Sequence, residues 1–254
     1  MNNYNHLKNK VVLITNGNSV FSKKLSMDFA KAGAHIILCC GEFNEKTVLN
    51  KLDIENENVD CNLMIGDVND NKFCKALIHS IRNKYGKLDV LVNNNPSPTY
   101  PISSLPEPIR KELVSISKMG IFSFQKLTEA AVSIMEANSN IINNQIIDDT
   151  GMEVDESDFL KEISSLKTFT EFYANRFLEK QIKANAIIYP QSFFSADNKS
   201  LNQWSLVNDF EDIHANKNLK MESPFLFLAS NPFKGFSGKI LQAENKKQSV
   251  EALN

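Results

Sequence analysis

Glycine and arginine are both scarce in this chain of 254 residues. It has nine glycines, about half of the usual share of roughly 7%, so a function built on a glycine-rich phosphate-binding loop is disfavoured. Its only arginines are Arg82, Arg110 and Arg176. The chain therefore has few planar guanidinium groups for bidentate recognition of phosphate.

The chain also lacks a strong net charge and a long apolar run. The formal net charge is −2, which argues against electrostatic binding of nucleic acid and against a polybasic membrane anchor. No apolar run approaches the roughly 20 residues of a membrane-spanning helix. The run VVLIT near the start is too short for a signal peptide. We therefore expect a cytoplasmic protein with no nucleic-acid and no membrane partner.

No metal-binding pattern is present among the four cysteines and four histidines. Cys39 and Cys40 are adjacent, Cys61 and Cys74 stand alone, and no spacing matches a zinc site. We expect no metal, and we interpret the thiols as buried side chains. A redox or metal role for them is the alternative.

Short apolar runs alternate along the whole chain with longer segments of helical period. Fully apolar short strands of this kind predict a parallel sheet covered by helices on both faces. Right-handed crossovers then give an α/β fold with a doubly wound, Rossmann-type, seven-stranded and mainly parallel sheet. We expect one domain over 1–254, with its core at about 8–243. The expected strands are 11–15, 35–40, 61–66, 88–93, 140–147, 183–189 and 238–243. The first expected helix ends near 32, and the others span 44–53, 70–84, 107–136, 155–181 and 222–230.

Five segments form an ordered set of motifs. They are NKVVLITNGNSVFSKKLSMDFAKAGAHIIL (9–38), GDVND (66–70), GKLDVLVNNN (86–95), IKANAIIYP (182–190) and FLFLASNPFKGFSGKIL (225–241). In order and spacing this set resembles the short-chain dehydrogenase/reductase (SDR) family, from about residue 8 to 243. The resemblance implies the Rossmann-type fold of that family and an ancestry among NAD(P)-dependent oxidoreductases.

The resemblance places the three glycines of the family's first turn on Asn16, Val20 and Ser22. In the family these glycines let the backbone approach the dinucleotide pyrophosphate and aim helix N–H groups at it. The β-branched Val20 would bring a side chain to the place of the phosphate, and Gly17 stands where the motif specifies no glycine. We therefore expect no bound cofactor. NAD(P) is the cofactor if the chain is a diverged oxidoreductase.

Two further cofactor positions have also changed. The residue that closes the second strand, an acid in NAD-dependent members, is Cys40, and the next, often arginine in NADP-dependent members, is Gly41. Asp67 and Asn93 are the cofactor-binding residues that the resemblance leaves. The alternative is that both cap strand ends and hold loops.

The catalytic positions carry no proton-transfer group. The family uses a tyrosine as general acid, with the pKa of its phenol lowered by a nearby lysine, together with a serine and an asparagine. The resemblance places the tyrosine on Phe159, the lysine on Ile163, the serine on Ile146 and the asparagine on Ser117. We therefore expect no catalytic residue and no hydride transfer of the family type.

An acidic segment precedes the fifth expected helix, at 147–159. One interpretation is a site for a cation or for acid–base chemistry. We favour the other, a solvated loop that supplies acids to the first turn of a helix. Its acids are Asp148, Asp149, Glu153, Asp155, Glu156 and Asp158.

Three hypotheses of function follow. The first is a pseudoenzyme, a non-catalytic subunit that pairs with a catalytic SDR paralogue through the helices at 107–136 and 155–181, as the resemblance implies. A homodimer or homotetramer stays open. The second is a diverged NAD(P)-dependent oxidoreductase with an unidentified proton donor. The third is a small-molecule-binding regulator that uses the former substrate cleft, under a lid-like segment at 192–220.

Overall fold

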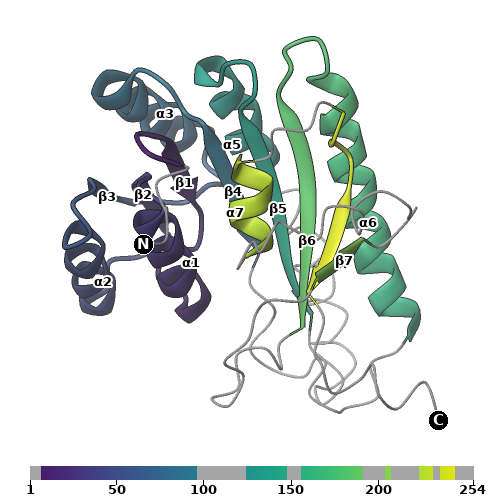
Figure 1. Ribbon diagram of the computed structural model, residues 1–254, viewed down its shortest axis with the longest axis horizontal. Coiled ribbons are helices and arrows are strands. Elements are labelled where there is room, and N and C mark those ends of the chain that lie inside the picture. Colours follow the sequence, from purple (N-terminus) through teal and green to yellow (C-terminus); the bar gives the residue numbers. More distant parts are fainter. Residues whose placement is uncertain are drawn as a thin grey trace, which may run out of the picture.

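The computed structural model describes residues 7–95, 124–147, 156–190, 204–206, 223–230 and 235–243. Within these ranges the strands form one sheet (Figure 1). They are β1 (Val11–Ile14), β2 (His35–Cys40), β3 (Cys61–Ile65), β4 (Val90–Asn95), β5 (Asn140–Ile147), β6 (Lys183–Pro190), β7 (Trp204–Leu206) and β8 (Ile240–Ala243). Their order is β3-β2-β1-β4-β5-β6-β8-β7.

The seven expected strands are confirmed, each within two residues of its predicted bounds, and all pair in parallel. The structure differs from the expectation in one respect, because the sheet has eight strands. The eighth, β7, lies in the segment expected to be lid-like and pairs antiparallel with β8, with Trp204 opposite Ala243. A strand of three residues is too short for its pattern to reveal it.

The helices fall close to their predicted ranges, but the helix expected at 155–181 ends earlier, at Arg176. They are α1 (Val20–Lys31), α2 (Glu45–Glu55), α3 (Asn71–Tyr85), α5 (Gln125–Ala131), α6 (Glu156–Arg176) and α7 (Pro224–Ser230), with a 3₁₀ turn, η2 (Val132–Ile134), after α5. Side chains of Ser19, Asn44 and Asp70 cap the first three by accepting a backbone N–H. Of the helix expected at 107–136, residues up to 123 lie outside the described ranges. No described helix has the length and apolar character needed to cross a membrane.

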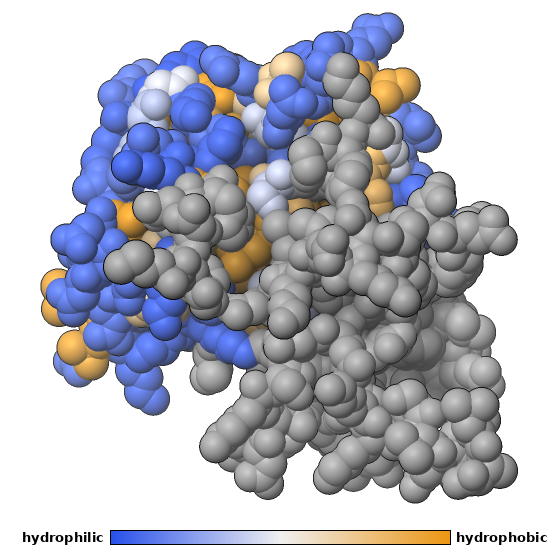
Figure 2. Space-filling model, in the orientation of Figure 1, coloured by the Kyte–Doolittle hydropathy of each residue, from blue (hydrophilic) through white to orange (hydrophobic). Residues whose placement is uncertain are grey.

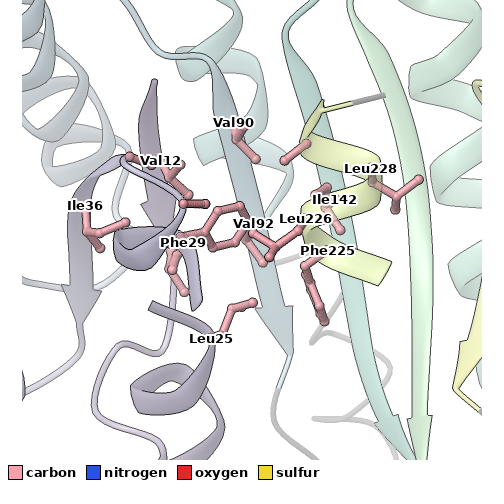
Figure 3. Packing of buried hydrophobic residues seen from close by; sticks show 14 of the residues in the cluster. Val12, Leu25, Phe29, Ile36, Val90, Val92, Ile142, Phe225, Leu226 and Leu228 are labelled. Atoms are coloured by element: carbon pink, nitrogen blue, oxygen red, sulfur yellow. The ribbon is translucent and has the colours of Figure 1, made fainter. Parts of the chain in front are cut away.

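Two apolar clusters cover the two faces of the sheet. One combines the sheet with side chains of α1, α2 and α7, and the other combines it with side chains of α3, α5 and α6. In Figure 3, Phe29 of α1 and Phe225 of α7 converge on Val92 and Ile142 of the sheet. Helices on both faces make this the doubly wound arrangement that the sequence predicts.

Helix α2 exposes apolar side chains and buries polar ones. Leu49 and Leu52 are 59% and 51% exposed, whereas Thr47 and Asn50 are buried. The Thr47 hydroxyl and both Asn50 amide atoms have no hydrogen-bond partner among the described residues. Figure 2 shows apolar atoms at the lower left margin, where Figure 1 places α2. Of the α2 residues, Ile54 belongs to the buried apolar cluster. This helix therefore buries less apolar surface than its neighbours.

The sheet order reverses between β1 and β4. From β1 the chain runs outward to β2 and β3, then returns to place β4 on the other side of β1. In open α/β sheets, ligands bind outside the carboxyl ends of the strands at such a switch point. The β1–α1 turn and the ends of β4 and β5 are therefore the place to look for a site.

A cluster of charged side chains lies at the opposite edge of the sheet, where the same strands begin. The buried Asp89 carboxylate accepts hydrogen bonds from Lys10 Nζ at 2.7 Å, Val11 N at 3.0 Å and Lys87 Nζ at 3.1 Å. Burial alone would raise the pKa of Asp89, but the bonds from Lys10, Val11 and Lys87 together lower it below its usual value. Asp89 therefore stabilises the fold as a carboxylate.

Replacing Asp89 by asparagine is expected to lower the free energy of unfolding by about 2 kcal/mol at neutral pH, because charge-assisted bonds are lost. The folded pKa is depressed, so the contribution of Asp89 is complete above its unfolded pKa and fades as the pH falls through the folded pKa. Urea unfolding at neutral and at successively more acid pH should show the gap to the unmodified chain closing. Asp60→Asn, which alters an exposed ion pair with Lys84, is the control, and a gap independent of pH would contradict this account.

Candidate functional site

The β1–α1 turn keeps a glycine-like backbone without the family's first glycine. Asn16 has φ of 51°, a left-handed conformation that asparagine tolerates better than most residues. The next residue is fixed against β2, since Gly17 N donates to Cys39 O at 2.9 Å. A Cβ on Gly17 would lie 2.8 Å from Leu38 Cβ, so only glycine fits there. Asn16 thus takes a left-handed conformation at the position where the resemblance places the first glycine.

Ser22 stands in the third glycine position with its side chain turned into the fold. It is fully buried. Its hydroxyl donates to Asn16 O at 2.7 Å and accepts a bond from the Ser19 hydroxyl at 2.9 Å. The Ser19 hydroxyl in turn accepts the Ser22 N–H at 3.0 Å and so caps α1. The replacement of glycine by serine therefore adds bonds to the turn.

Asn94 joins this turn to the neighbouring strands. Its side-chain amide donates to Ser22 Oγ at 2.8 Å and accepts from Asn144 Nδ2 at 2.7 Å. Its backbone N donates to Thr15 Oγ1 at 2.8 Å, and its carbonyl accepts from Asn16 Nδ2 at 2.5 Å. Ser22, Asn94 and Asn144 lie on three different elements and are all fully buried. Sequence reasoning missed this network, although the repeated Asn-Asn pairs at 93–94 and 143–144 were a signal.

Asn93 holds the other face of the sheet together. Its amide nitrogen donates to Thr128 Oγ1 on α5 at 3.0 Å and to Asn143 Oδ1 on β5 at 2.9 Å. Asn143 in turn donates to Thr170 Oγ1 on α6 at 3.0 Å. Asn93 is 1% exposed. These are the fold-holding contacts that the sequence offers as the alternative to cofactor binding.

Asp67 lies at the same edge of the sheet but is exposed. One carboxylate oxygen, Oδ1, accepts from Asn69 N at 2.8 Å and from Asn69 Nδ2 at 3.0 Å. The backbone closes a turn as well, because Asp70 N donates to Asp67 O at 3.0 Å. Among the described residues the second oxygen, Oδ2, has no hydrogen-bond donor. Asp67 thus both holds a loop and offers a free acceptor at the surface.

The end of β2 offers neither a ribose acceptor nor a phosphate clamp. Cys40 is fully buried, and burial, only partly opposed by a bond from the Gly17 backbone, raises the pKa of its thiol to about 11. A Cβ on Gly41 would meet no atom within 4 Å. Space is therefore open beside Cys40, but the charged groups that distinguish NAD from NADP are absent at these two positions.

The four cysteines are free and buried, which confirms the prediction of buried thiols. Burial raises the pKa of Cys39 and of Cys61 to about 12, and that of Cys74 is raised as well. All four are protonated at neutral pH and poor nucleophiles. In the ranges that the structure describes, no group of three or more His, Cys, Asp or Glu residues is arranged to hold a metal ion.

The structure describes some of the positions where the resemblance places the catalytic residues. Ile146 lies near the end of β5, buried in the apolar cluster beneath α1 and α7. Phe159 and Ile163 lie in the first half of α6, and their side chains are not among those described. Ser117 and most of the acidic segment, 148–155, fall outside the described ranges. The position near the end of β5 where the resemblance places the serine thus holds a buried apolar side chain.

Tyr173 and Tyr189 do not replace the missing tyrosine. Tyr173 packs between Phe169 and Phe177 on α6, and burial, the largest influence, raises its pKa to about 12. Burial also raises the pKa of Tyr189. A tyrosine that delivers a proton in hydride transfer needs a lowered pKa, so neither side chain suits that role.

Replacing Asn94 by alanine is expected to destabilise the fold by about 2 kcal/mol, because it leaves the Ser22 hydroxyl and the Asn144 amide short of buried partners. Asn18→Ala is the matched control, since Asn18 belongs to the same turn but is exposed, and its effect should stay within about 0.5 kcal/mol. Urea denaturation of both variants measures the difference. Equal effects of the two substitutions would show that the network does not hold the turn.

Comparison with known proteins agrees with this architecture. Residues 10–145 match the family model described as short chain dehydrogenase. General stress protein 39 of Bacillus subtilis (strain 168) is 30% identical over 181 residues, which cover 71% of this chain and 63% of that protein. The uncharacterized oxidoreductase YhdF of the same organism is 33% identical over 184 residues, 71% of this chain and 62% of that protein. The match thus spans less than two thirds of the length of these relatives.

Solved structures share the fold over nearly the whole chain. A short chain dehydrogenase from Mycobacterium smegmatis superimposes with a TM-score of 0.68 at 18% identity, covering 97% of this chain and 96% of that one. An NADH-dependent reductase complexed with NAD gives a TM-score of 0.67 at 17% identity, with 94% and 97% covered. With the family model matching more than half of the sequence, this chain belongs to the short-chain dehydrogenase/reductase family.

Proposed function

We propose that this chain is a pseudoenzyme of the SDR family, a subunit that keeps a nucleotide-binding edge but transfers no hydride and supports a catalytic relative. The observation that carries the proposal is Ile146, which occupies the place of the family's serine and packs into the apolar core. Phe159 and Ile163 take the places of the tyrosine and the lysine. Hydride transfer to a carbonyl also requires a proton for the oxygen, and these three side chains have none to give.

The sequence alone led us to expect no bound cofactor, but the geometry of the β1–α1 turn leads us to propose that a nucleotide binds. Asn16 keeps the left-handed turn and Ser22 points inward, so neither replacement obstructs the approach of a phosphate to the helix N-terminus. Asp67 supplies an acceptor for the base end of a nucleotide. In catalytic relatives a bound nicotinamide gives or accepts a hydride. In this chain we assign the edge to binding alone, and we expect the affinity to be reduced by Val20 at the first position of α1.

The exposed faces of α5 and α6 support the proposed role as a subunit. Phe172 is 52% exposed, and the Arg176 guanidinium lies 5.6 Å from the centre of its ring. Arg176 also pairs with Glu129 of α5 at 3.6 Å. An aromatic ring and an arginine side by side are typical of the centre of a protein interface. We assign this face to a partner subunit, a catalytic SDR relative or a second copy of the chain, and the assembly to the cytoplasm.

A second candidate is a diverged NAD(P)-dependent oxidoreductase. The family model matches residues 10–145, the part of the chain that forms the nucleotide edge. One relative, 24% identical over 247 residues, is an NADPH-dependent aldehyde reductase of Arabidopsis thaliana. This candidate requires a proton donor other than the tyrosine and the lysine, and the acidic segment 148–158 carries the nearest carboxyl groups in the sequence to β5.

Turnover separates the two candidates. The unmodified chain is expected to consume no NADH or NADPH with aldehydes, ketones or sugars and to reduce no NAD or NADP with polyols. The double variant Phe159→Tyr with Ile163→Lys is expected to stay inactive, because Ile146 and Val20 are unchanged. Absorbance of the reduced nicotinamide measures this, with a catalytic SDR as positive control. Turnover by the unmodified chain would overturn the pseudoenzyme proposal.

The partner face is tested by replacing its exposed aromatic side chain with a charged one. Phe172→Glu is expected to weaken association with the partner subunit about tenfold or more, equivalent to about 1.4 kcal/mol, because a carboxylate would be buried in the interface. Phe43→Glu is the matched control, since Phe43 is 67% exposed on the other side of the molecule, beside α2. Sedimentation of each variant with the co-expressed relative gives the affinity. A loss of affinity in Phe43→Glu alone would contradict this assignment and place the interface beside α2.

A further inference from the structure

Helix α3 and the turn that follows it carry positive charge without any acidic residue. From 71 to 87 the sequence has five lysines and arginines and no aspartate or glutamate, although the formal net charge of the chain is −2. Two of the five cations pair with Asp60 and Asp89. The three that form no ion pair with a described residue are Lys72, Lys75 and Arg82.

These three cations lie on one side of α3. Their spacing of three and seven residues brings them to the same side of a helix, and all three are exposed. A fourth exposed cation, Lys126, joins them from α5, which packs beside α3 (Figure 1). Its Nζ donates to Asn69 O, just before α3, at 2.7 Å. We call the surface formed by Lys72, Lys75, Arg82 and Lys126 the α3–α5 face.

Two of these charges oppose the stability of α3. Lys72 and Lys75 are about one helical turn apart, and like charges at that spacing repel each other. Lys72 also lies in the first turn of α3, which has no acidic residue, and the helix dipole favours negative charge there. Stability alone would favour an acid at one of these positions. An anionic partner outside the helix accounts for positive charge at both.

The other two cations are held in place by the protein. Arg82 Nη2 donates to Ser133 O at 3.0 Å, and Lys126 is bonded to Asn69 O. A side chain that is already fixed loses less conformational entropy on binding. A guanidinium has five N–H donors and an ammonium has three, so both groups keep donors that these contacts do not use.

We propose that the α3–α5 face binds an acidic segment of a partner protein. The cations extend over about 15 Å from Lys72 to Arg82, at roughly 1.5 Å per helical residue, which is the length of a short peptide segment. Carboxylates along such a segment accept the hydrogen bonds that ammonium and guanidinium groups donate. This surface is distinct from the nucleotide edge and from the Phe172 face, and the proposal depends on neither.

The other side chains of the face favour a protein over a membrane or a nucleic acid. None of the large apolar side chains exposed in the described ranges belongs to α3 or α5, whereas a membrane-surface helix inserts such side chains. The exposed residues of these two helices include no phenylalanine, tyrosine or tryptophan. Single-stranded nucleic acids are commonly bound by stacking their bases on aromatic rings, and this face offers none.

The proposal is tested with an oligoglutamate peptide as the probe, titrated into the full chain at low ionic strength and followed by fluorescence anisotropy. The double variant Lys75→Glu with Arg82→Glu is expected to bind the peptide about tenfold more weakly or worse, because two exposed attractions become repulsions. Lys75→Glu alone, whose side chain forms no described hydrogen bond, should weaken binding about threefold. A urea-unfolding curve of each variant checks that the fold is retained.

The matched control is Lys24→Glu with Lys31→Glu on α1. Both lysines are exposed, and the double substitution changes the net charge by the same amount, so it should bind the peptide as the unmodified chain does. Equal weakening by the two double variants would reduce the effect to net charge and overturn the proposal. Failure of the unmodified chain to bind the peptide would overturn it as well.

Two further probes distinguish other occupants of the face. Tighter binding of oligothymidylate or of vesicles containing phosphatidylserine than of the peptide, lost in Lys75→Glu with Arg82→Glu, would replace the protein partner by a nucleic acid or a membrane. Self-association in sedimentation, abolished by the same substitutions, would replace it by a second copy of the chain. Each of these results would contradict the proposal, and none of them depends on whether a nucleotide binds.

Discussion

The buried hydroxyl of Ser22 is the point on which the carboxyl edge of the sheet depends. It donates to Asn16 O, and it accepts from Ser19 and from the Asn94 amide, so its hydrogen-bonding capacity is fully used. Through Asn94 and Asn144 the same network reaches β4 and β5. In the family, the conformational freedom of glycine allows this turn. In this chain, side-chain hydrogen bonds stabilise it. Because buried polar groups are costly without partners, each member constrains the others.

The function that we propose separates nucleotide binding from proton transfer, two properties that coincide in a catalytic SDR. The polar residues that organise the nucleotide edge persist in modified form, as the Asn16 turn and the exposed Asp67 illustrate. The positions where the family resemblance places the proton-transfer groups hold Ile146, Phe159 and Ile163, and we propose that proton transfer is lost with them. A chain that loses only the second property can still bind, fold around a ligand and assemble. We therefore interpret it as a supporting subunit, with the Phe172 face of α6 offered to the partner.

The fold was predictable because short apolar strands and amphipathic helices each leave a local pattern. All seven parallel strands carry such a pattern, whereas β7 has three residues and pairs antiparallel at the edge, which no local pattern reveals. The site was predictable only in part. Motif spacing placed Asp67, Asn93 and Ile146 near the carboxyl ends of strands, where the structure also has them. The left-handed conformation of Asn16 and the bond of Ser22 to Asn94, 72 positions away, arise from tertiary packing.

The most direct measurement is a thermal-shift titration of the unmodified chain with NAD(H) and NADP(H). The central claim is that the carboxyl edge still binds a nucleotide although the proton-transfer groups are gone. A ligand present at about 100 times its dissociation constant stabilises the fold by roughly 2.7 kcal/mol, so a clear rise in melting temperature at millimolar cofactor is the expected result. No shift at that concentration would contradict the claim and leave the edge with a structural role only.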